Sequence, residues 1–418
     1  MTPVTAMWVN MGNSIILSRL RRSVTELSVR ATYRYLERAT ELAASGVEVI
    51  SLGIGQPDFS PPGYVIDALK EACDKGMFRY VSSQGTESFK RAVSEFLKCE
   101  LGVDVKPDEV LAVPGASAGI FMGLYALLNP GDEVIVLDPA FPQYFDVVKV
   151  LGGRVVPVKL RELSDEFVVD IDNVVSAITD RTKVIILNTP HNPTGMVIPE
   201  STMMKLLDVA REHGIIVLSD EVYDHFVYEG KHTSCLHHPE WRDFCIYVNS
   251  LSKTFAMTGW RVGFVVARRE VIQKLSALAN NIYSCLPPFI MYAAEVALRS
   301  GLDWFKEVLR EYRRRRDLAL SELRKVSGIR CVRPRGAFYL YPNLSDILSE
   351  LGLSIGDFVE LLIVKKGVVT LPSTVFSIAG DVEHIRMSFT VPVEKLLSGL
   401  ARFKDFIDEL RSMRGRVK

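Results

Sequence analysis

The chain has 418 residues, of which 48% are hydrophobic and 24% are charged, a composition typical of a globular protein with two or three domains. Fifty basic and fifty acidic side chains cancel, so no overall charge favours nucleic acid or an anionic membrane as a partner. No uncharged run approaches the length of a membrane span, and the apolar stretch near the N-terminus lacks the features of a secretory signal. Six scattered cysteines without a Cys-x-x-Cys pair predict reduced thiols in a cytoplasmic protein, and no metal site is expected.

Two domains and an N-terminal extension are predicted. Residues 1–22 form the extension, and a helix is predicted over Val24–Ala44, where apolar residues recur at helical spacing. Pro61–Pro62–Gly63 indicates a loop, after which a large domain is expected over residues 63–299. From about residue 300, long charged helices and short strands predict a second, smaller α+β domain.

Seven short apolar runs alternate with helical segments in the large domain. This alternation predicts a mostly parallel sheet with helices on both faces. The candidate strands are Val110–Val113, Glu133–Leu137, Arg154–Val158, Lys183–Leu187, Ile215–Leu218, Cys245–Val248 and Val262–Ala267. Several of them end in polar residues, and ligands of open α/β sheets collect at the carboxyl ends of strands. The pattern therefore predicts a cofactor crevice at that edge of the sheet.

The segment from Asn249 to Arg261 carries the most chemistry. A lysine amine is nucleophilic only when deprotonated, and a semi-buried position for Lys253 would lower its pKa. Two hydroxyls, Ser250 and Ser252, together with the guanidinium of Arg261 would suit a phosphate. A lysine beside a phosphate site suggests a Schiff base with pyridoxal 5'-phosphate (PLP). Taken alone, the motif also fits a solvated lysine in a polar turn.

Three further motifs follow strands. The turn Gly115–Ala116–Ser117 opens an apolar helix, whose free amides suit a phosphate. The turn from Asn188 to Gly195 contains two prolines and leaves Asn192 to offer an amide donor. Asp220 and Tyr223 are three residues apart, so one helical turn could aim both at a single ligand. Each motif alone also has a purely structural explanation, as a turn, a helix N-cap or a core aromatic.

Together these motifs resemble the class I and II PLP-dependent aminotransferases of fold type I, from about Val24 to about Leu410. The resemblance implies an α/β large domain with a mostly parallel seven-stranded sheet, and it adds residues 23–62 to residues 300–418 in the small α+β domain. It implies that Lys253 holds the cofactor and moves the α-proton, that Asp220 pairs with the pyridinium nitrogen, and that Asn192 and Tyr223 donate to the phenolic oxygen.

The resemblance implies the remaining site residues as well. Phe141 matches an aromatic that stacks on the cofactor ring. Tyr80 matches a tyrosine that reaches the phosphate of the neighbouring subunit, so a homodimer with shared active sites is expected. Arg386 is implied to bind the substrate α-carboxylate in a bidentate fork, with Gly55 supplying a backbone amide to the same group. The cofactor-binding set is then Gly115, Ala116, Ser117, Phe141, Asn192, Asp220, Tyr223, Ser250, Ser252, Lys253, Arg261 and Tyr80, and the substrate-binding set is Gly55, Asn192 and Arg386.

The implied activity is a ping-pong transfer of an amino group from an L-amino acid to a 2-oxo acid such as 2-oxoglutarate. Aspartate-preferring relatives place a basic residue at the distal carboxylate, but Ala116 stands where the related bacterial type has lysine, and residues 276–298 contain no arginine or lysine. Because an unpaired carboxylate there would be costly, an aromatic or other apolar amino donor is predicted. Ser373 stands where relatives have glycine and is expected to stiffen a loop near the substrate.

Three alternatives are weighed against this interpretation. Aspartate aminotransferase and a PLP-dependent carbon–sulfur β-lyase on the same fold remain open. A transcription regulator with an aminotransferase-like domain would need a DNA-binding module, for which about 20 extra N-terminal residues are too few.

Overall fold

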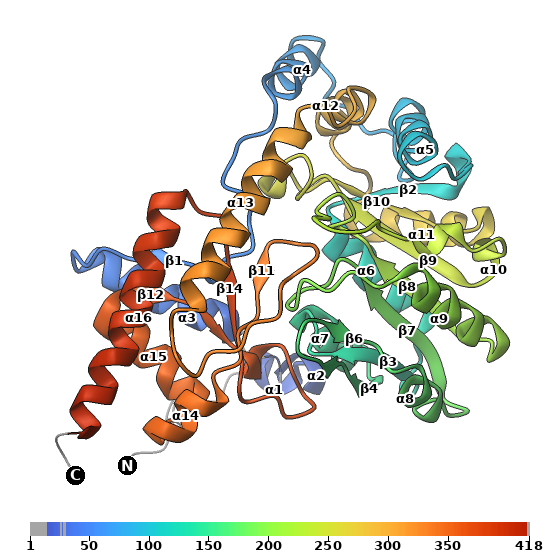
Figure 1. The fold of residues 1–418 in the computed structure, drawn as a ribbon. Helices are drawn as coiled ribbons and strands as arrows, with labels where there is room; N and C mark the ends of the chain where they lie inside the picture. The colour runs from blue at the N-terminus through green and yellow to red at the C-terminus, as the bar shows by residue number, and fades with distance from the viewer. Residues whose placement is uncertain (1–14, 26, 28–30, 416–418) are drawn as a thin grey trace.

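The computed structural model describes residues 15–25, 27 and 31–415 (Figure 1). Residues 1–14 of the predicted extension lie outside this part. The described remainder of the extension contains α1 (Ile15–Arg19) and the start of α2 (Arg22–Thr25). Of the helix predicted over Val24–Ala44, residues 26 and 28–30 lie outside the described part, and α3 runs over Ala31–Ala44.

All seven predicted strands of the large domain are present and form one sheet (Figure 1). Only β10 runs antiparallel to its neighbours within this sheet. Most of the sheet is buried on both faces, which is why its strands read as nearly continuous apolar runs. The spatial order is β2 (Val110–Val113), β10 (Gly263–Val266), β9 (Cys245–Ser250), β8 (Ile216–Asp220), β7 (Thr182–Asn188), β3 (Glu133–Asp138) and β4 (Arg154–Lys159).

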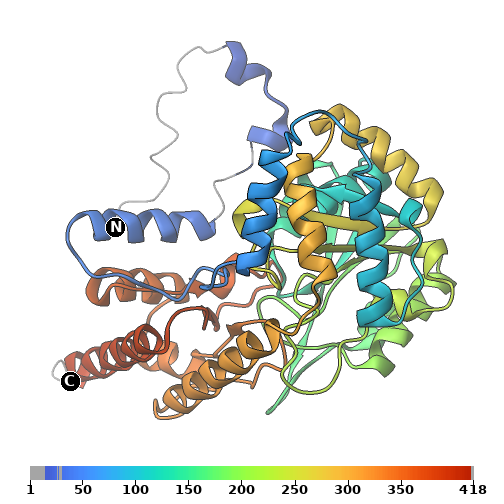
Figure 2. The same cartoon turned by 90° about the horizontal axis from the view of Figure 1, so that it is seen from above.

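Helices cover both faces of this sheet. Side chains alternate between the two faces along a strand, so in β2 Leu111 and Val113 join one apolar cluster while Val110 and Ala112 join the other. The first cluster includes residues of α6 (Ala116–Leu127), α7 (Pro142–Val150) and α11 (Arg269–Tyr283). The second includes residues of α4 (Gly63–Asp74), α5 (Glu87–Leu101), α9 (Glu200–Glu212) and α12 (Pro288–Arg299). Figure 2 shows α12 lying between α4 and α5, both of which it contacts. The short α8 (Ile171–Ser176) and α10 (Trp241–Phe244) complete this part of the chain.

A second group of elements lies beside the large sheet. Its three-stranded antiparallel sheet has the order β11 (Tyr339–Leu340), β14 (Ile385–Ser388) and β13 (Leu371–Pro372). The parallel pair β1 (Ile50–Ser51) and β12 (Val368–Val369) joins the N-terminal segment to the C-terminal part of the chain. The helices are α13 (Phe305–Leu323), α14 (Ser345–Leu351), α15 (Ile355–Lys366) and α16 (Val393–Gly415). The domain limits at residues 62–63 and 299–300 stay a prediction, and we use "large domain" and "small domain" in that sense.

A small hairpin, β5 (Arg161–Glu162) with β6 (Phe167–Val168), extends from the large domain after β4. Within the described residues, none of the helices has the length and apolar character needed to span a membrane.

Candidate active site

A cavity of about 590 Å³ opens at the carboxyl ends of the large-domain strands. Residues from both domains line it. Of the sequence-predicted site residues, those that line the cavity are Gly55, Ala116, Ser117, Phe141, Asn192, Asp220, Tyr223, Ser250, Ser252, Lys253, Arg261 and Arg386. The predicted crevice at this edge of the sheet is therefore present, and it has a size typical of small-molecule sites.

Asp220 is the last residue of β8 and is 4% exposed. Its Oδ2 atom accepts a hydrogen bond from the Tyr144 hydroxyl at 2.6 Å, and its Oδ1 atom accepts one from the Val222 amide at 3.3 Å. Burial raises the pKa of Asp220 to about 6, because these two donors offset only part of the lost hydration. A cation bound beside this carboxylate would be stabilised by it.

The prediction that Asp220 and Tyr223 share a helical turn is wrong. Residues 222–225 form an isolated turn, because the chain leaves it at once to pair Val227 with Gly336 of the small domain. Both side chains nevertheless line the cavity. The turn therefore directs both side chains to the same cavity, as the predicted helical turn was expected to do.

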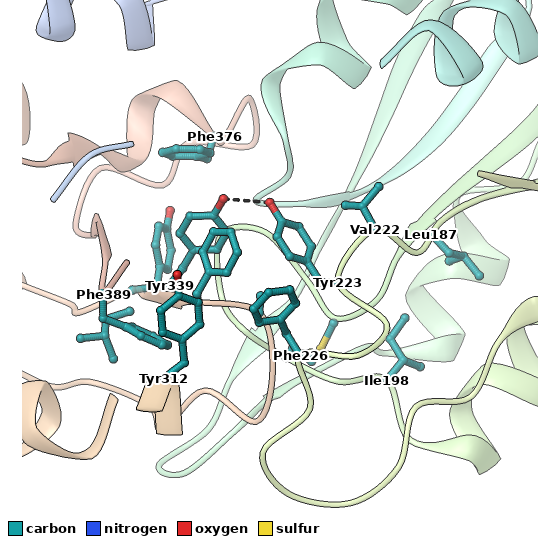
Figure 3. Packing of buried hydrophobic residues seen from close by; sticks show 14 of the residues in the cluster. Leu187, Ile198, Val222, Tyr223, Phe226, Tyr312, Tyr339, Phe376 and Phe389 are labelled. Carbon is teal, nitrogen blue, oxygen red and sulfur yellow. Dashed lines mark hydrogen bonds between the residues drawn. The ribbon is translucent and has the colours of Figure 1, made fainter. Parts of the chain in front are cut away.

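The Tyr223 hydroxyl lies 2.8 Å from the Tyr339 hydroxyl, which comes from β11 of the small domain (Figure 3). Burial raises the pKa of both phenols above the ordinary value. Phe226 packs near them from the large domain, and Tyr312 packs near them from α13. This aromatic contact joins the two domains directly behind the cavity wall.

Lys253 lies three residues beyond the end of β9, and its Nζ atom donates to the carbonyl of Gly55 at 2.7 Å. Burial and the nearby guanidinium of Arg386 lower the pKa of Lys253 to about 8, against the opposing effect of Asp220. Near physiological pH a minor fraction of this amine is therefore neutral, far more than for an ordinary lysine, and the neutral amine is the state that can attack a carbonyl.

The N-terminus of α6 faces Arg261 across a glycine. Gly115 has φ of +81°, and a Cβ atom at this position would lie 2.5 Å from Nη2 of Arg261, so no other residue fits there without displacing the guanidinium. The Arg261 side chain donates to the carbonyls of Thr258 at 2.7 Å and Pro114 at 3.3 Å. A fixed, exposed guanidinium beside unpaired helix amides makes an anion site.

Arg386 on β14 is 4% exposed. It donates to Oδ1 of Asn192 at 3.0 Å and to the carbonyl of Gly53 at 2.6 Å. Its guanidinium lies between two rings, 4.4 Å from the Tyr339 centroid and 4.6 Å from the Phe376 centroid. Its Nε atom is buried and has no hydrogen-bond partner among the described residues. A buried cation that contacts only neutral oxygens is suited to a carboxylate ligand.

Asn192 connects these groups to the sheet. Its backbone amide donates to Oδ1 of Asn188, the last residue of β7, at 2.8 Å. The Asn188 amide group in turn donates to the carbonyl of Asp220 at 2.9 Å. The ends of two neighbouring strands thereby fix the positions of Asn192 and Asp220 relative to each other.

Comparison with known proteins gives the family. Residues 47–403 match the family model described as aminotransferase class I and II. The chain belongs to this family. It is 40% identical to the aspartate aminotransferase of Sulfolobus acidocaldarius over 94% of this chain and 99% of the relative. It is 38% identical to the aromatic-amino-acid aminotransferase 2 of Thermococcus litoralis over 88% of this chain and 94% of the relative.

Solved structures show the same likeness. The structure of the Thermus thermophilus aspartate aminotransferase double mutant matches with a TM-score of 0.86 and 36% identity, over 93% of this chain and 99% of that chain. Such neighbours establish the fold type I architecture of this aminotransferase, and its mostly parallel seven-stranded sheet agrees with this architecture. The predicted fold class and enzyme class are confirmed.

Two predicted residues do not line the cavity. Gly115 lies directly behind it, against Arg261. Tyr80 is 88% exposed and is not among the lining residues. Its predicted role concerns a neighbouring subunit and stays a prediction.

Three aromatic residues of the site were missed from the sequence: Tyr144, Tyr339 and Phe376. Tyr144 follows Phe141 by three residues, which after one helical turn gives the same face, and this spacing was the available signal. Tyr339 and Phe376 come from short small-domain elements whose approach to the cavity only the fold reveals. No cluster of potential metal ligands is present in the described part of the chain.

Proposed function

We propose that this aminotransferase uses PLP held by Lys253, and that it favours an aromatic or other apolar L-amino acid as donor. The observation that carries the proposal is the arrangement of four charged groups in one cavity: Lys253, Asp220, Arg261 and Arg386. Each of these four groups suits a different part of PLP or of the bound amino acid.

The donor set fits the cofactor. The aldehyde requires a neutral amine, and Lys253 has a pKa lowered to about 8. The phosphate requires the helix N-terminus at Gly115 and the guanidinium of Arg261. The protonated ring nitrogen requires a buried carboxylate, for which Asp220 is available. When bound, PLP supplies an electron-accepting ring that allows the α-proton of an amino acid to leave.

The protein's own residues then have separate tasks. Arg386 would bind the α-carboxylate through its unpartnered Nε atom and an adjacent Nη atom, which orients the substrate in the cavity. The Lys253 amine would take the α-proton and return it in the reverse half-reaction. Tyr223, held by Tyr339, would keep a hydroxyl donor in a fixed place. Because these residues come from two domains, movement of the domains toward each other would complete the site and exclude water.

The donor preference rests on the remaining wall of the cavity. Apart from Lys253, Arg261 and Arg386, no arginine or lysine of the described residues lines it. The rest of the lining includes apolar and aromatic groups, among them Ile54, Ile120, Phe141, Phe376 and Tyr339. An apolar side chain bound there would gain burial without leaving a charge unpaired. We propose 2-oxoglutarate as the acceptor, as the family resemblance implies; its distal carboxylate, like that of aspartate, would have to be met by a group from outside this lining.

Aspartate aminotransferase is the second candidate, because several of the relatives carry that name, including the one from Sulfolobus acidocaldarius. A cation for the distal carboxylate would then have to come from outside the lining described above. A β-lyase on this fold is distinguished by pyruvate and ammonia released without a second oxo acid.

We further propose a homodimer in which Tyr80 reaches the phosphate site of the partner. Tyr80 is 88% exposed and the nearby Phe78 is 64% exposed. Two neighbouring aromatic side chains are seldom this exposed unless the surface of a partner covers them. All six cysteines are free thiols, in keeping with the cytoplasm as the proposed location. Sedimentation of the purified protein tests the dimer, and loss of PLP affinity in Tyr80→Ala at unchanged dimer content tests the residue.

A direct experiment tests the cofactor assignment. The protein is mixed with PLP, reduced with borohydride and digested, and the modified peptide is identified by mass spectrometry. Modification at Lys253 is expected, with none in Lys253→Ala and normal labelling in Lys274→Ala, a control at an exposed lysine of α11. Labelling spread over several surface lysines would refute the assignment.

A further inference from the structure

The loop that carries Phe376 has a structural role of its own. This Phe376 loop, residues 373–384, connects β13 to β14, the strand of Arg386. The Phe376 side chain is 1% exposed, lines the cavity, and lies 4.6 Å from the guanidinium of Arg386. Figure 3 shows its ring on the same side of the aromatic group as the hydroxyls of Tyr223 and Tyr339. The loop therefore forms part of the surroundings of the buried arginine.

Hydrogen bonds within the loop hold its two ends together. The hydroxyl of Ser373, the residue that replaces the family's glycine, donates to the carbonyl of Asp381 at 2.9 Å. The Ser373 amide donates to the carbonyl of His384 at 2.8 Å, and the Asp381 amide donates to Oγ of Ser377 at 3.1 Å. The loop is thus closed on itself by these three hydrogen bonds.

One carboxylate of the large domain holds this unit in place. Asp138, the last residue of β3, is 2% exposed. Its Oδ1 atom accepts from the Ser377 hydroxyl at 2.6 Å, and its Oδ2 atom accepts from the amides of Ile378 at 2.8 Å and Ala379 at 3.3 Å. Two residues further on, the Ala140 amide donates to the carbonyl of Phe376 at 2.7 Å.

A second tie lies at the other end of the loop. His384 contacts Asp381 through Nδ1 at 2.9 Å and Glu162, on the large-domain hairpin, through Nε2 at 3.2 Å. The ring also stacks on Tyr341 with a centroid distance of 4.6 Å. The loop is therefore bound to the large domain at residues 376–379, which include Phe376 itself, and at its last residue, His384.

We propose that Asp138 is a positioning residue that fixes the Phe376 loop, and through Phe376 the guanidinium of Arg386, for binding the carboxylate of both substrates. The inference rests on the proposed role of Arg386. Asp138 has no contact with the cavity and takes no part in the chemistry. Asp138 acts instead on the orientation of the Arg386 guanidinium, because the hydrogen bonds of this cation are directional and its Nε atom must reach the ligand.

The test uses Asp138→Asn in the PLP-loaded enzyme. An asparagine has one acceptor oxygen in place of two, so either the Ser377 hydroxyl or the two loop amides face an NH₂ group. The KM values for phenylalanine and for 2-oxoglutarate are expected to rise together by about tenfold, with kcat changed less than threefold. The inhibition constant of 3-phenylpropionate, an unreactive carboxylate, is expected to rise by the same factor, and the affinity for PLP to stay unchanged.

Glu133→Gln is the matched control. Glu133 begins the same strand, is equally buried, and also accepts several hydrogen bonds, including those from Thr179 and Arg181 at 2.8 Å each. It lies at the opposite end of β3 from the cavity. The control is expected to lower the Tm while leaving both KM values within twofold of the wild type.

The outcomes separate the possibilities. If Asp138→Asn lowers the Tm with unchanged KM values, as the control does, the positioning role is wrong. If Asp138→Asn does not fold, Ser377→Ala removes one of the three donors and is expected to raise both KM values about threefold; unchanged values would overturn the inference. If Arg386→Lys leaves both KM values unaltered, it is the proposed role of Arg386 that fails.

Discussion

The hydrogen bond from Tyr144 to Asp220 offers a quantitative test of how the site controls the charge of that carboxylate. Both groups are buried, and the hydroxyl lies 2.6 Å from Oδ2. A hydrogen bond to a charged group contributes about 1.5–3 kcal/mol. Since 1.36 kcal/mol corresponds to one pKa unit, Tyr144→Phe is expected to raise the pKa of Asp220 above its value of about 6 by about one to two pH units. At neutral pH about half or more of the carboxylate would then be protonated, which makes it a poorer partner for a ring cation.

Two assays follow from this shift. The affinity for PLP, measured by absorbance titration, is expected to fall about tenfold or more, and the acidic limb of the kcat/KM profile is expected to move to higher pH by about one to two units. Tyr228→Phe is the control, because Tyr228 is equally buried and donates at 2.6 Å to a backbone carbonyl, that of Ala337, outside the cavity. If Tyr144→Phe and Tyr228→Phe both keep the wild-type affinity and profile, the account of Asp220 is refuted.

Three further predictions concern charge. The rate at which the apoprotein combines with PLP should rise with pH and level off above about 8, because Lys253 has a pKa of about 8; stopped-flow absorbance showing a rise continuing to pH 10 would contradict this. Arg386→Lys should lower kcat/KM for amino and oxo acids alike, in steady-state assays, by about tenfold or more, since lysine keeps the charge but loses one hydrogen bond to the carboxylate, worth about 1.5–3 kcal/mol. The folded-state pKa of His384 is raised to about 9 by hydrogen bonds to Asp381 and Glu162, although burial alone would lower it. Its stabilising contribution is therefore complete below about pH 6.5 and is lost as the pH rises through 9. In Tm measurements, His384→Asn should flatten the decline over that window, and an unchanged decline would count against it.

The strands of the large domain could be predicted from the sequence because each is a short apolar run, most of them are buried, and several have a polar end. The same regularity identified the residues at the carboxyl ends of those strands, including Asn192, Asp220 and Lys253, all of which line the cavity. For these positions, the local pattern and the fold impose the same requirement.

The rest of the site depended on contacts between distant parts of the chain. Tyr339 reaches Tyr223 across 116 residues, and Asp138 reaches the Phe376 loop across about 240. Neither has a periodic signal, because the small-domain strands are only two to four residues long. The helical turn expected between Asp220 and Tyr223 is absent because the pairing of Val227 with Gly336, again a contact between distant residues, overrides the local spacing.

The most direct test of the central claim is a single half-reaction. The PLP-loaded protein is mixed with phenylalanine alone, and separately with aspartate alone, and the visible absorbance of the bound cofactor and the 2-oxo acid product are followed together. Phenylalanine is expected to remove the absorbance with one equivalent of 2-oxo acid per site, and 2-oxoglutarate is expected to restore it. Aspartate is expected to react at least tenfold less efficiently. Equal or better reaction with aspartate would contradict the proposed donor class, and continuous release of ammonia without a second oxo acid would contradict amino-group transfer itself.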